Sequence, residues 1–178
     1  MATGLKTRLD YGDYSAIPPD GKRYELFDGE VFVTPAPSPL HQRLVLRLAR
    51  ALQDYFGTRA EVFVAPIDVI FSPHDVVQSD IVAVENQTQV SQRGIEGPPL
   101  LVVEVLSPAT AIYDRSVKSR HYAALGVRHY WILDPPARTL ECYRAEEGVL
   151  RLVASATADT RLVHPDLPDF VLADRFWV

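Results

Sequence analysis

Apolar residues in this chain gather into short runs separated by turn-forming residues, with two longer stretches of helical periodicity between them. The first run, RYELFDGEVFV over residues 23–33, places Asp28 and Gly29 between two arms rich in apolar residues. An Asp-Gly pair in that position is a strong signal for a tight turn between antiparallel strands. We therefore expect an N-terminal β-hairpin.

The segment after the hairpin predicts the first long helix. The run TPAPSP, Thr34 to Pro39, interrupts the strand pattern, and Ser38 before Pro39 suits the N-cap and first position of a helix. Leucine residues then recur at helical spacing. The expected helix runs from Pro39 to Phe56 and ends at Gly57.

A second helix and a series of short strands make up the rest of the expected fold. The helix covers residues 110–126, where Thr110 can cap its start and Gly126 can end it. Residues 85–97 are polar and predict a loop or a short irregular helix, and the apolar tail, residues 162–178, is expected to pack back on the protein. The remaining apolar runs predict strands over residues 60–66, 67–71, 76–84, 100–106, 127–134, 139–145 and 149–155.

This order of elements predicts an α/β or α+β fold with a mixed central β-sheet flanked by helices. A chain of 178 residues is long enough for a sizeable core, so we expect one domain over residues 1–178. The run Leu100 to Leu106 is continuously apolar, which is typical of a central strand covered on both faces. The helix after it is expected to pack across one face of the sheet.

Charge and composition narrow the classes of partner. The formal net charge of −5 weakens a case for non-specific nucleic-acid binding, which depends on Lys and Arg side chains that neutralise phosphates. A local basic surface stays open, because Arg43, Arg47 and Arg50 share one face of the first helix. The alternative is an ordinary solvated face opposite the leucines.

The expected location is cytoplasmic, without contact to a membrane. No apolar run approaches the roughly 20 residues of a membrane-spanning helix. The first residues, MATGLKTRLDYGDYS, lack the apolar core of a signal peptide. A single cysteine, Cys142, excludes an internal disulfide and offers no metal cluster.

Two carboxylates interrupt apolar strands. Glu104 lies within the run Leu100 to Leu106, where an ionised side chain loses its hydration and requires a cation, a hydrogen-bond network or a raised pKa. Asp80 interrupts the strand predicted over residues 76–84, and the two side chains can converge at one sheet edge if their strands are neighbours. Two acids that share a site repel unless a cation lies between them. Oxygen ligands without a Cys or His cluster favour Mg²⁺ or Mn²⁺.

A hard cation held by two carboxylates suits hydrolysis of a phosphodiester, because it acidifies a bound water and stabilises charge on the phosphate. A nearby lysine would add a positive charge that stabilises the developing anion. Ordinary ion pairs explain isolated strand acids equally well, so the two acids alone leave both interpretations open.

The order of the motifs RYELFDGEVFV, SPLHQRL, VAPIDVIFSPHDVVQSDIVAV and LLVVEVLSPATAIYDRSVKSRHYAALGVRHYWILDP resembles the Uma-type restriction endonuclease family, formerly a domain of unknown function. The resemblance extends from about Arg23 to Phe176 and is most specific between Glu104 and Pro135. It implies the restriction-endonuclease-like fold of the PD-(D/E)XK nuclease superfamily. It also implies metal-dependent hydrolysis of nucleic-acid phosphodiester bonds, with DNA as the expected substrate.

The resemblance further implies roles for individual residues. Asp80 matches the metal-binding aspartate and Glu104 its acidic partner, with Mg²⁺ or Mn²⁺ as the cofactor. The proline expected before the aspartate is Ser79 here, and Leu106 stands where the superfamily motif has lysine. In this family the lysine lies on the following helix, where Lys118 is the matching catalytic residue.

Spacing alone leaves an alternative for Lys118. It shares a helix face with Asp114 and Tyr122, which is also the pattern of a surface ion pair. Three further residues are possible additions to the site, although a strand residue, a sheet-edge acid and a capping or packing histidine are their ordinary interpretations. They are Glu25, Asp68 and His41.

Three functions are therefore open. The first is an endonuclease that acts as a homodimer, because cutting both strands of duplex DNA commonly needs two active sites, and the apolar segments FVLADRFWV and VLRLVAS offer surfaces for association. The second is a catalytically silent nuclease-fold domain that acts as a binding or assembly module, which the acidic net charge favours. The third is a metal-free stress or regulatory protein. Buried acids favour the first, because a binding module does not need them.

Overall fold

The structure is a computed structural model that describes residues 8–173 and 176–177; residues 1–7, part of the N-terminal stretch considered above, and residues 174, 175 and 178 of the apolar tail lie outside the described residues. The helical elements are α1 (Tyr11–Ser15), α2 (Pro39–Phe56), the short turn η1 (Gln87–Gln89), α3 (Ala111–Tyr113), the π-helical turn η2 (Asp114–Lys118) and α4 (Ser119–Ala124).

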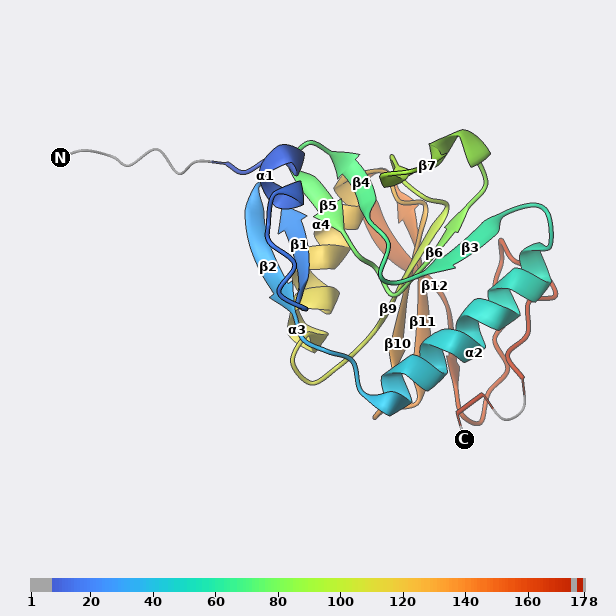
Figure 1. Ribbon diagram of the computed structural model, residues 1–178. Helices are drawn as coiled ribbons and strands as arrows, with labels where there is room; N and C mark the ends of the chain where they lie inside the picture. Colours follow the sequence, from blue (N-terminus) through green and yellow to red (C-terminus); the bar gives the residue numbers. More distant parts are fainter. Residues whose placement is uncertain (1–7, 174–175, 178) are drawn as a thin grey trace.

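The strands form two six-stranded sheets (Figure 1). In spatial order, sheet A contains β2 (Glu30–Thr34), β1 (Arg23–Phe27), β5 (Asp75–Val77), β4 (Val69–Ser72), β8 (Gly94–Glu96) and β7 (Val90–Ser91). Sheet B contains β12 (Val149–Thr157), β11 (Thr139–Glu146), β10 (His129–Asp134), β9 (Leu101–Val105), β6 (Ile81–Val84) and β3 (Glu61–Val64). The mixed α+β fold class is as expected, but two sheets replace the single sheet of the prediction.

Local signals placed the hairpin and the first helix correctly. Asp28 and Gly29 have φ angles of 49° and 76°, the left-handed conformation that a two-residue hairpin turn requires. The hydroxyl of Ser38 accepts a hydrogen bond from the N–H of His41, and the residue after α2, Gly57, caps its end. Both predictions are confirmed.

The prediction of one continuous strand over residues 76–84 is wrong, and the difference affects the site. The segment is broken into β5, which ends at Val77, and β6, which begins at Ile81, so the chain crosses from sheet A to sheet B at Gln78–Asp80. The N–H of Gln78 is bound by the side chain of Glu25 instead of a neighbouring strand. Asp80 therefore precedes β6 and does not lie inside a strand.

Two other predicted segments also differ. Residues 85–97 contain η1 and the hairpin β7–β8, because β8 finds its partner in the remote strand β4, where the N–H of Ile95 donates to the carbonyl of Asp68 at 2.8 Å. The helix expected over residues 110–126 is divided by the π-helical turn η2. Thr110 occupies the N-cap position of α3 without a side-chain capping bond, and Gly126 follows α4 with a φ of 87°.

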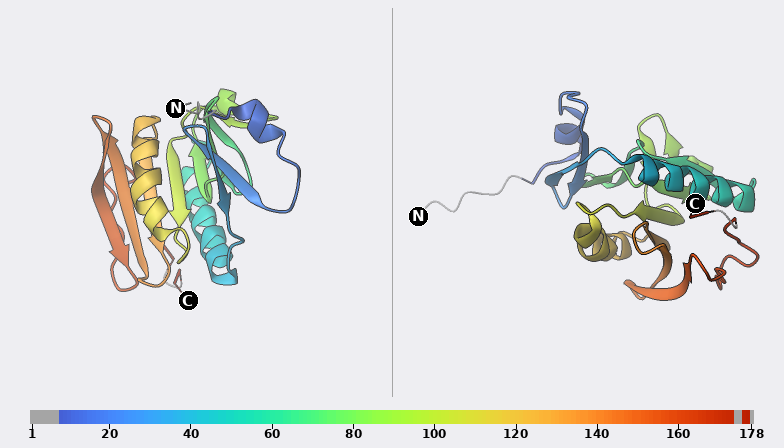
Figure 2. Two further views of the ribbon diagram at one scale, coloured as in Figure 1. Left: turned by 90° about the vertical axis from the view of Figure 1, so that its left-hand side faces the viewer. Right: turned by 90° about the horizontal axis from the view of Figure 1, so that it is seen from below.

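Sheet B is covered on both faces, as the apolar run Leu100 to Leu106 predicted for its central strand β9 (Figure 2). On one face, α2 packs through Leu44, Leu48 and Leu52. The C-terminal segment joins the same core, which confirms the prediction for the apolar tail, through Leu162, Leu167, Phe170 and Phe176. On the other face, Tyr122 of α4 packs with side chains from both sheets.

Strand register explains how remote carboxylates come together. β6 pairs with β9 in antiparallel fashion with Ile81 opposite Val103, so continuing the register by one residue sets Asp80 opposite Glu104. β9 runs parallel to β10, with Glu104 beside Ile132. Side chains directly opposite each other lie on the same sheet face. In the described part of the chain, no helix is both long and apolar enough to cross a membrane.

Candidate active site

Asp80 and Glu104 both line one small cavity of about 40 Å³, where β6 begins and β9 ends. Oδ2 of Asp80 accepts a hydrogen bond from the backbone N–H of Val105, at 2.9 Å, and lies 3.1 Å from Nε2 of His41. Both carboxylates are buried, with exposed fractions of 6% and 4%. The sheet register and these contacts thus hold the two carboxylates at the same cavity.

Lys118 is buried among three carboxylates. Its ammonium lies 3.0 Å from Oε1 of Glu104, 3.1 Å from Oε2 of Glu25 and 3.6 Å from Oδ1 of Asp114. The interpretation of Lys118 and Asp114 as an exposed surface pair is therefore wrong, because both residues are buried in the π-helical turn η2. π-Helical turns of this kind are frequent at functional sites.

Tyr122 and Ser79 complete the surroundings of Glu104. The hydroxyl of Tyr122 donates to Oε1 of Glu104 at 2.7 Å and lies 2.9 Å from the hydroxyl of Ser79. Burial raises the pKa of Tyr122 well above its ordinary value, so the phenol stays protonated and serves as a donor. Ser79, which stands where the family pattern has proline, thus contributes a polar contact to the site.

His41 and Arg23 approach Asp80 from different elements. His41 lies in the first turn of α2, and its contact with Asp80 leaves Nδ1 buried without a hydrogen-bond partner in the described part of the chain. The guanidinium of Arg23, at the start of β1, lies 3.9 Å from Oδ1 of Asp80, and its NH2 group donates to the carbonyl of Gln78. Nε of Arg23 is likewise buried without a partner among the described residues. Arg23 therefore faces Asp80 with part of its hydrogen-bonding capacity unused.

Each of the two carboxylates has one oxygen left to bind a hard divalent cation. Oδ1 of Asp80 and Oε2 of Glu104 make no hydrogen bond within the described residues, while their other oxygens are held by protein donors. The described residues contain no group of three or more His, Cys, Asp and Glu side chains arranged to hold a metal. Two carboxylates nonetheless suffice for Mg²⁺, which usually keeps several waters and completes its shell with substrate phosphate.

Burial and crowding of acids raise the pKa of Glu104 to about 8, although the ammonium of Lys118 acts in the opposite direction. Burial also raises the pKa of Asp114. Burial alone would lower the pKa of Lys118, but the carboxylates of Glu104, Glu25 and Asp114 raise it well above its ordinary value. One ammonium faces several acids, so this shortage of positive charge favours the protonated form of Glu104.

Asp68 and Leu106 lie outside this carboxylate cluster. Oδ1 of Asp68 accepts hydrogen bonds from Tyr14 and from the side-chain amide of Gln78, each at 2.9 Å, and Asp68 does not line the cavity. Leu106 packs in the apolar core between the sheets. Sequence reasoning missed Arg23 and the contact of Ser79, since neither stands out in the local pattern. Tyr122 was visible through its helical spacing from Lys118.

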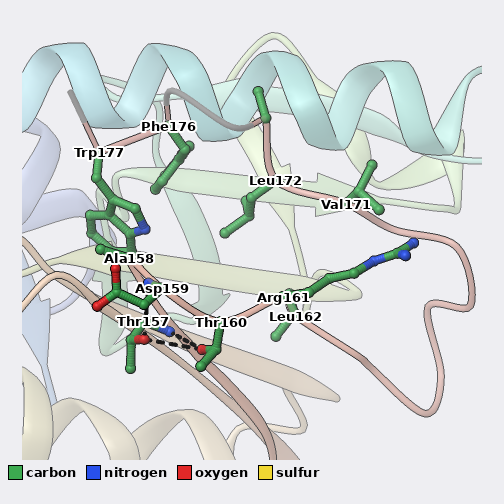
Figure 3. Close-up of a pocket in the computed structure, with 11 residues that line it drawn as sticks. Thr157, Ala158, Asp159, Thr160, Arg161, Leu162, Val171, Leu172, Phe176 and Trp177 are labelled. Atoms are coloured by element: carbon green, nitrogen blue, oxygen red, sulfur yellow. Dashed lines mark hydrogen bonds between the residues drawn. The ribbon is translucent and has the colours of Figure 1, made fainter.

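A larger hollow of about 670 Å³ lies at the C-terminal segment, and it shares no lining residue with the carboxylate cavity. Figure 3 shows Val171, Leu172, Phe176 and Trp177 opposite the turn that contains Thr160. Among the described residues that line it, the ionisable side chains are Asp159 and Arg161, both exposed. This described lining does not include converging buried groups like those of the smaller cavity.

The raised pKa of Glu104 has a testable consequence for stability. The folded protein binds a proton at Glu104 more tightly than the unfolded chain, so metal-free stability should fall as pH rises from about 4.5 to about 8. Glu104→Gln removes this titration and keeps an oxygen that can accept from Lys118 and Tyr122. Urea unfolding at the two ends of that interval should show a smaller loss for the variant and, at the upper end, stability equal to or above wild type. A strong loss at both ends would instead identify Glu104 as half of a structural ion pair.

Comparison with known proteins places this geometry in a family. No curated protein matches the chain. A solved structure described as "a putative nuclease belonging to DUF820 from Anabaena variabilis" has a similar fold, with a TM-score of 0.75 and 16% sequence identity over 96% of this chain and 99% of that one. A family model named Uma2, with the description "Putative restriction endonuclease", matches residues 11–175. Because that match spans almost the whole sequence, the chain belongs to the Uma2 family.

Proposed function

We propose that the protein is a metal-dependent endonuclease that hydrolyses phosphodiester bonds of DNA. The observation that carries this proposal is the convergence of Asp80, Glu104 and Lys118 on one cavity, each held from a different element. Membership of a family described as restriction endonucleases and a fold shared with a nuclease both support it. The cytoplasmic location expected from the sequence stays a prediction.

Asp80 and Glu104 are the proposed ligands of Mg²⁺ or Mn²⁺, through Oδ1 of Asp80, which has only the ion-pair contact with Arg23, and Oε2 of Glu104. When bound there, the cation supplies Lewis acidity toward the phosphate and toward a water molecule. His41 and the N–H of Val105 fix the carboxylate of Asp80 in one orientation, which is the usual work of residues behind a metal ligand.

Lys118 and Arg23 are the proposed sources of positive charge for the reaction. The ammonium of Lys118 lies beside Glu104, where it offsets the negative charge that develops as the phosphodiester is cleaved. The guanidinium of Arg23 lines the same cavity and adds positive charge toward a phosphate oxygen there. Glu25 and Asp114 keep Lys118 protonated and in place.

The silent binding module stays the alternative, because the cluster is also a satisfied network of buried charges. Lys118 reaches three carboxylates, and such a network can fix a fold without chemistry. The free donor and acceptor atoms at the cavity favour catalysis, since a purely structural network would leave fewer of them unused.

A homodimer is proposed as the active form. β12 is an edge strand of sheet B and exposes Val149 and Leu152, and the C-terminal segment exposes Val163 and Val171. Exposed apolar side chains at an unpaired strand edge are typical of association surfaces.

The first prediction of this proposal concerns metal binding. Mn²⁺ should raise the melting temperature of the wild type, because a ligand that binds only the folded state stabilises it, and Asp80→Asn should abolish the increase. Asp68→Asn, a matched change outside the cavity, should leave it intact. Affinity measured by Mn²⁺ titration should increase with pH up to about 8, because the cation competes with the proton on Glu104.

Variants of His41 provide the control for the geometry of Asp80. His41→Gln places an amide donor near the position of Nε2 and should retain most of the Mn²⁺ affinity, whereas His41→Leu should lose roughly tenfold or more. Equal melting-temperature increments in wild type, Asp80→Asn and His41→Leu would refute the metal site.

Lys118 gives the second prediction. Lys118→Met should reduce cleavage of a DNA substrate at least about a hundredfold, the range for loss of one electrostatic donor. It should also destabilise the fold by about 3–5 kcal/mol, because it leaves buried carboxylates without a cation. The double variant Glu25→Gln/Lys118→Met should recover stability in urea unfolding but not cleavage. Recovery of both together would show that Lys118 acts only on the fold.

The third prediction is self-association. Light scattering at micromolar protein should report a homodimer, and Leu152→Glu should convert it to a monomer because a charge replaces an apolar side chain at the strand edge. Arg151→Glu alters charge at the neighbouring position and serves as the control. A wild type that is strictly monomeric would exclude the homodimer.

A further inference from the structure

The carboxylate cavity opens between two larger pockets. One, of about 360 Å³, is lined mainly by apolar residues of the β2–α2 connection and of the segments after β9 and β10, including Pro35, Leu40, Leu106, Pro108 and Pro135. The other, of about 290 Å³, lies on the side of Phe32 and Tyr113. All three hollows share Pro35. The carboxylate cavity and the apolar pocket also share His41 and Ser107. The apolar pocket is thus continuous with the proposed site of cleavage.

The apolar pocket lies where a binding site is expected from topology. β9 and β10 are the parallel pair of sheet B, and their carboxyl ends lead directly into Leu106 and Pro135. Ligands of α/β sheets commonly bind outside the carboxyl ends of parallel strands. The volume falls within the range of pockets that hold small molecules.

Charge around the cavity speaks against a site built to follow the backbone of a duplex. Among the described residues that line the three hollows, Arg23 and Lys118 are the only Lys or Arg side chains, and both already face carboxylates of the cluster. Binding of duplex DNA relies on several such cations at the phosphates. Binding of a single strand relies on such cations too, but stacking of its unpaired bases on side chains adds affinity that a duplex, with its bases already stacked, does not gain.

We infer that the substrate of this site is an unpaired nucleotide, and that the apolar pocket holds the base next to the cleaved phosphate. This inference rests on the proposed nuclease function and specifies its substrate as single-stranded or locally unpaired DNA. Pro35, Leu40 and Pro135 provide apolar contacts to the base, while His41 and Ser107 provide polar atoms at the rim shared with the cavity. Stacked bases in a duplex cannot enter such a pocket unless they are unpaired.

Binding is the direct test, because it needs no cleavage. Fluorescence anisotropy of the wild type in EDTA is compared for a short single-stranded DNA oligonucleotide, the duplex of the same sequence and a single-stranded RNA version. The single strand should bind at least about fivefold more tightly than the duplex, the lower end for one stacked base. Leu40→Glu should weaken single-strand binding by a similar factor.

The matched control is Leu46→Glu, which adds the same charge to an exposed residue of α2 that does not line the pocket. Circular dichroism melting should show both variants folded. Equal or tighter binding of the duplex would overturn the inference, and so would equal weakening by the two substitutions, which would report charge alone.

Cleavage distinguishes failure of this inference from failure of the proposed function. Mn²⁺-dependent cutting of duplex and single strand at equal rates leaves the nuclease proposal standing and removes the pocket's role. Single-strand binding that depends on Leu40 in a protein that neither binds Mn²⁺ nor cuts DNA supports the pocket and favours the binding module. Replacing successive nucleotides by abasic ones should slow cutting most at one position beside the cleaved bond.

Discussion

The buried ammonium of Lys118 joins the two sheets through contacts with carboxylates of both. Lys118 contacts Glu25 from sheet A, Glu104 from sheet B and Asp114 from its own turn. Each carboxylate would be costly to bury alone, and together they would repel, so the position of each depends on the same cation. The packing of α4 between the sheets and the approach of the N-terminal hairpin are both tied to that contact.

The same arrangement leaves the cluster with more acids than cations. Acids outnumber the cation, which raises the pKa of Glu104 to about 8 and leaves the cluster short of positive charge. A divalent ion, if it binds as proposed, would relieve that shortage. The structural network and the proposed catalytic centre share one set of residues, so variants that separate stability from turnover are the informative ones.

Sequence patterns were sufficient where the cause of structure is local. Asp28-Gly29 specified the hairpin turn, Ser38-Pro39 the start of α2, and Glu104 stood out because a carboxylate in an apolar run demands an explanation. The break after Val77 could not be predicted, because the partner of Gln78 is the side chain of Glu25, which is remote in sequence.

The remaining site residues could not be predicted from local sequence patterns. Lys118 entered through resemblance to a family, since its spacing from Asp114 describes a surface pair equally well. Arg23 and the hydroxyl of Ser79 gave no signal, because their importance arises only once two sheets and a helix meet.

The crossing of the chain between sheets at Gln78–Asp80 makes the buried cluster depend on the docking of both sheets. β9 to β12 lie in chain order within sheet B, whereas the contact of Lys118 with Glu25 joins residues 93 positions apart. Contacts between remote residues bear a larger loop-closure entropy and form late. A chain with sheet B packed but the hairpin undocked lacks Glu25 and Arg23 at the cavity. Lys118 keeps its contacts with Glu104 and Asp114 in such a chain but lacks its contact with Glu25, so the full cluster exists only in the finished fold.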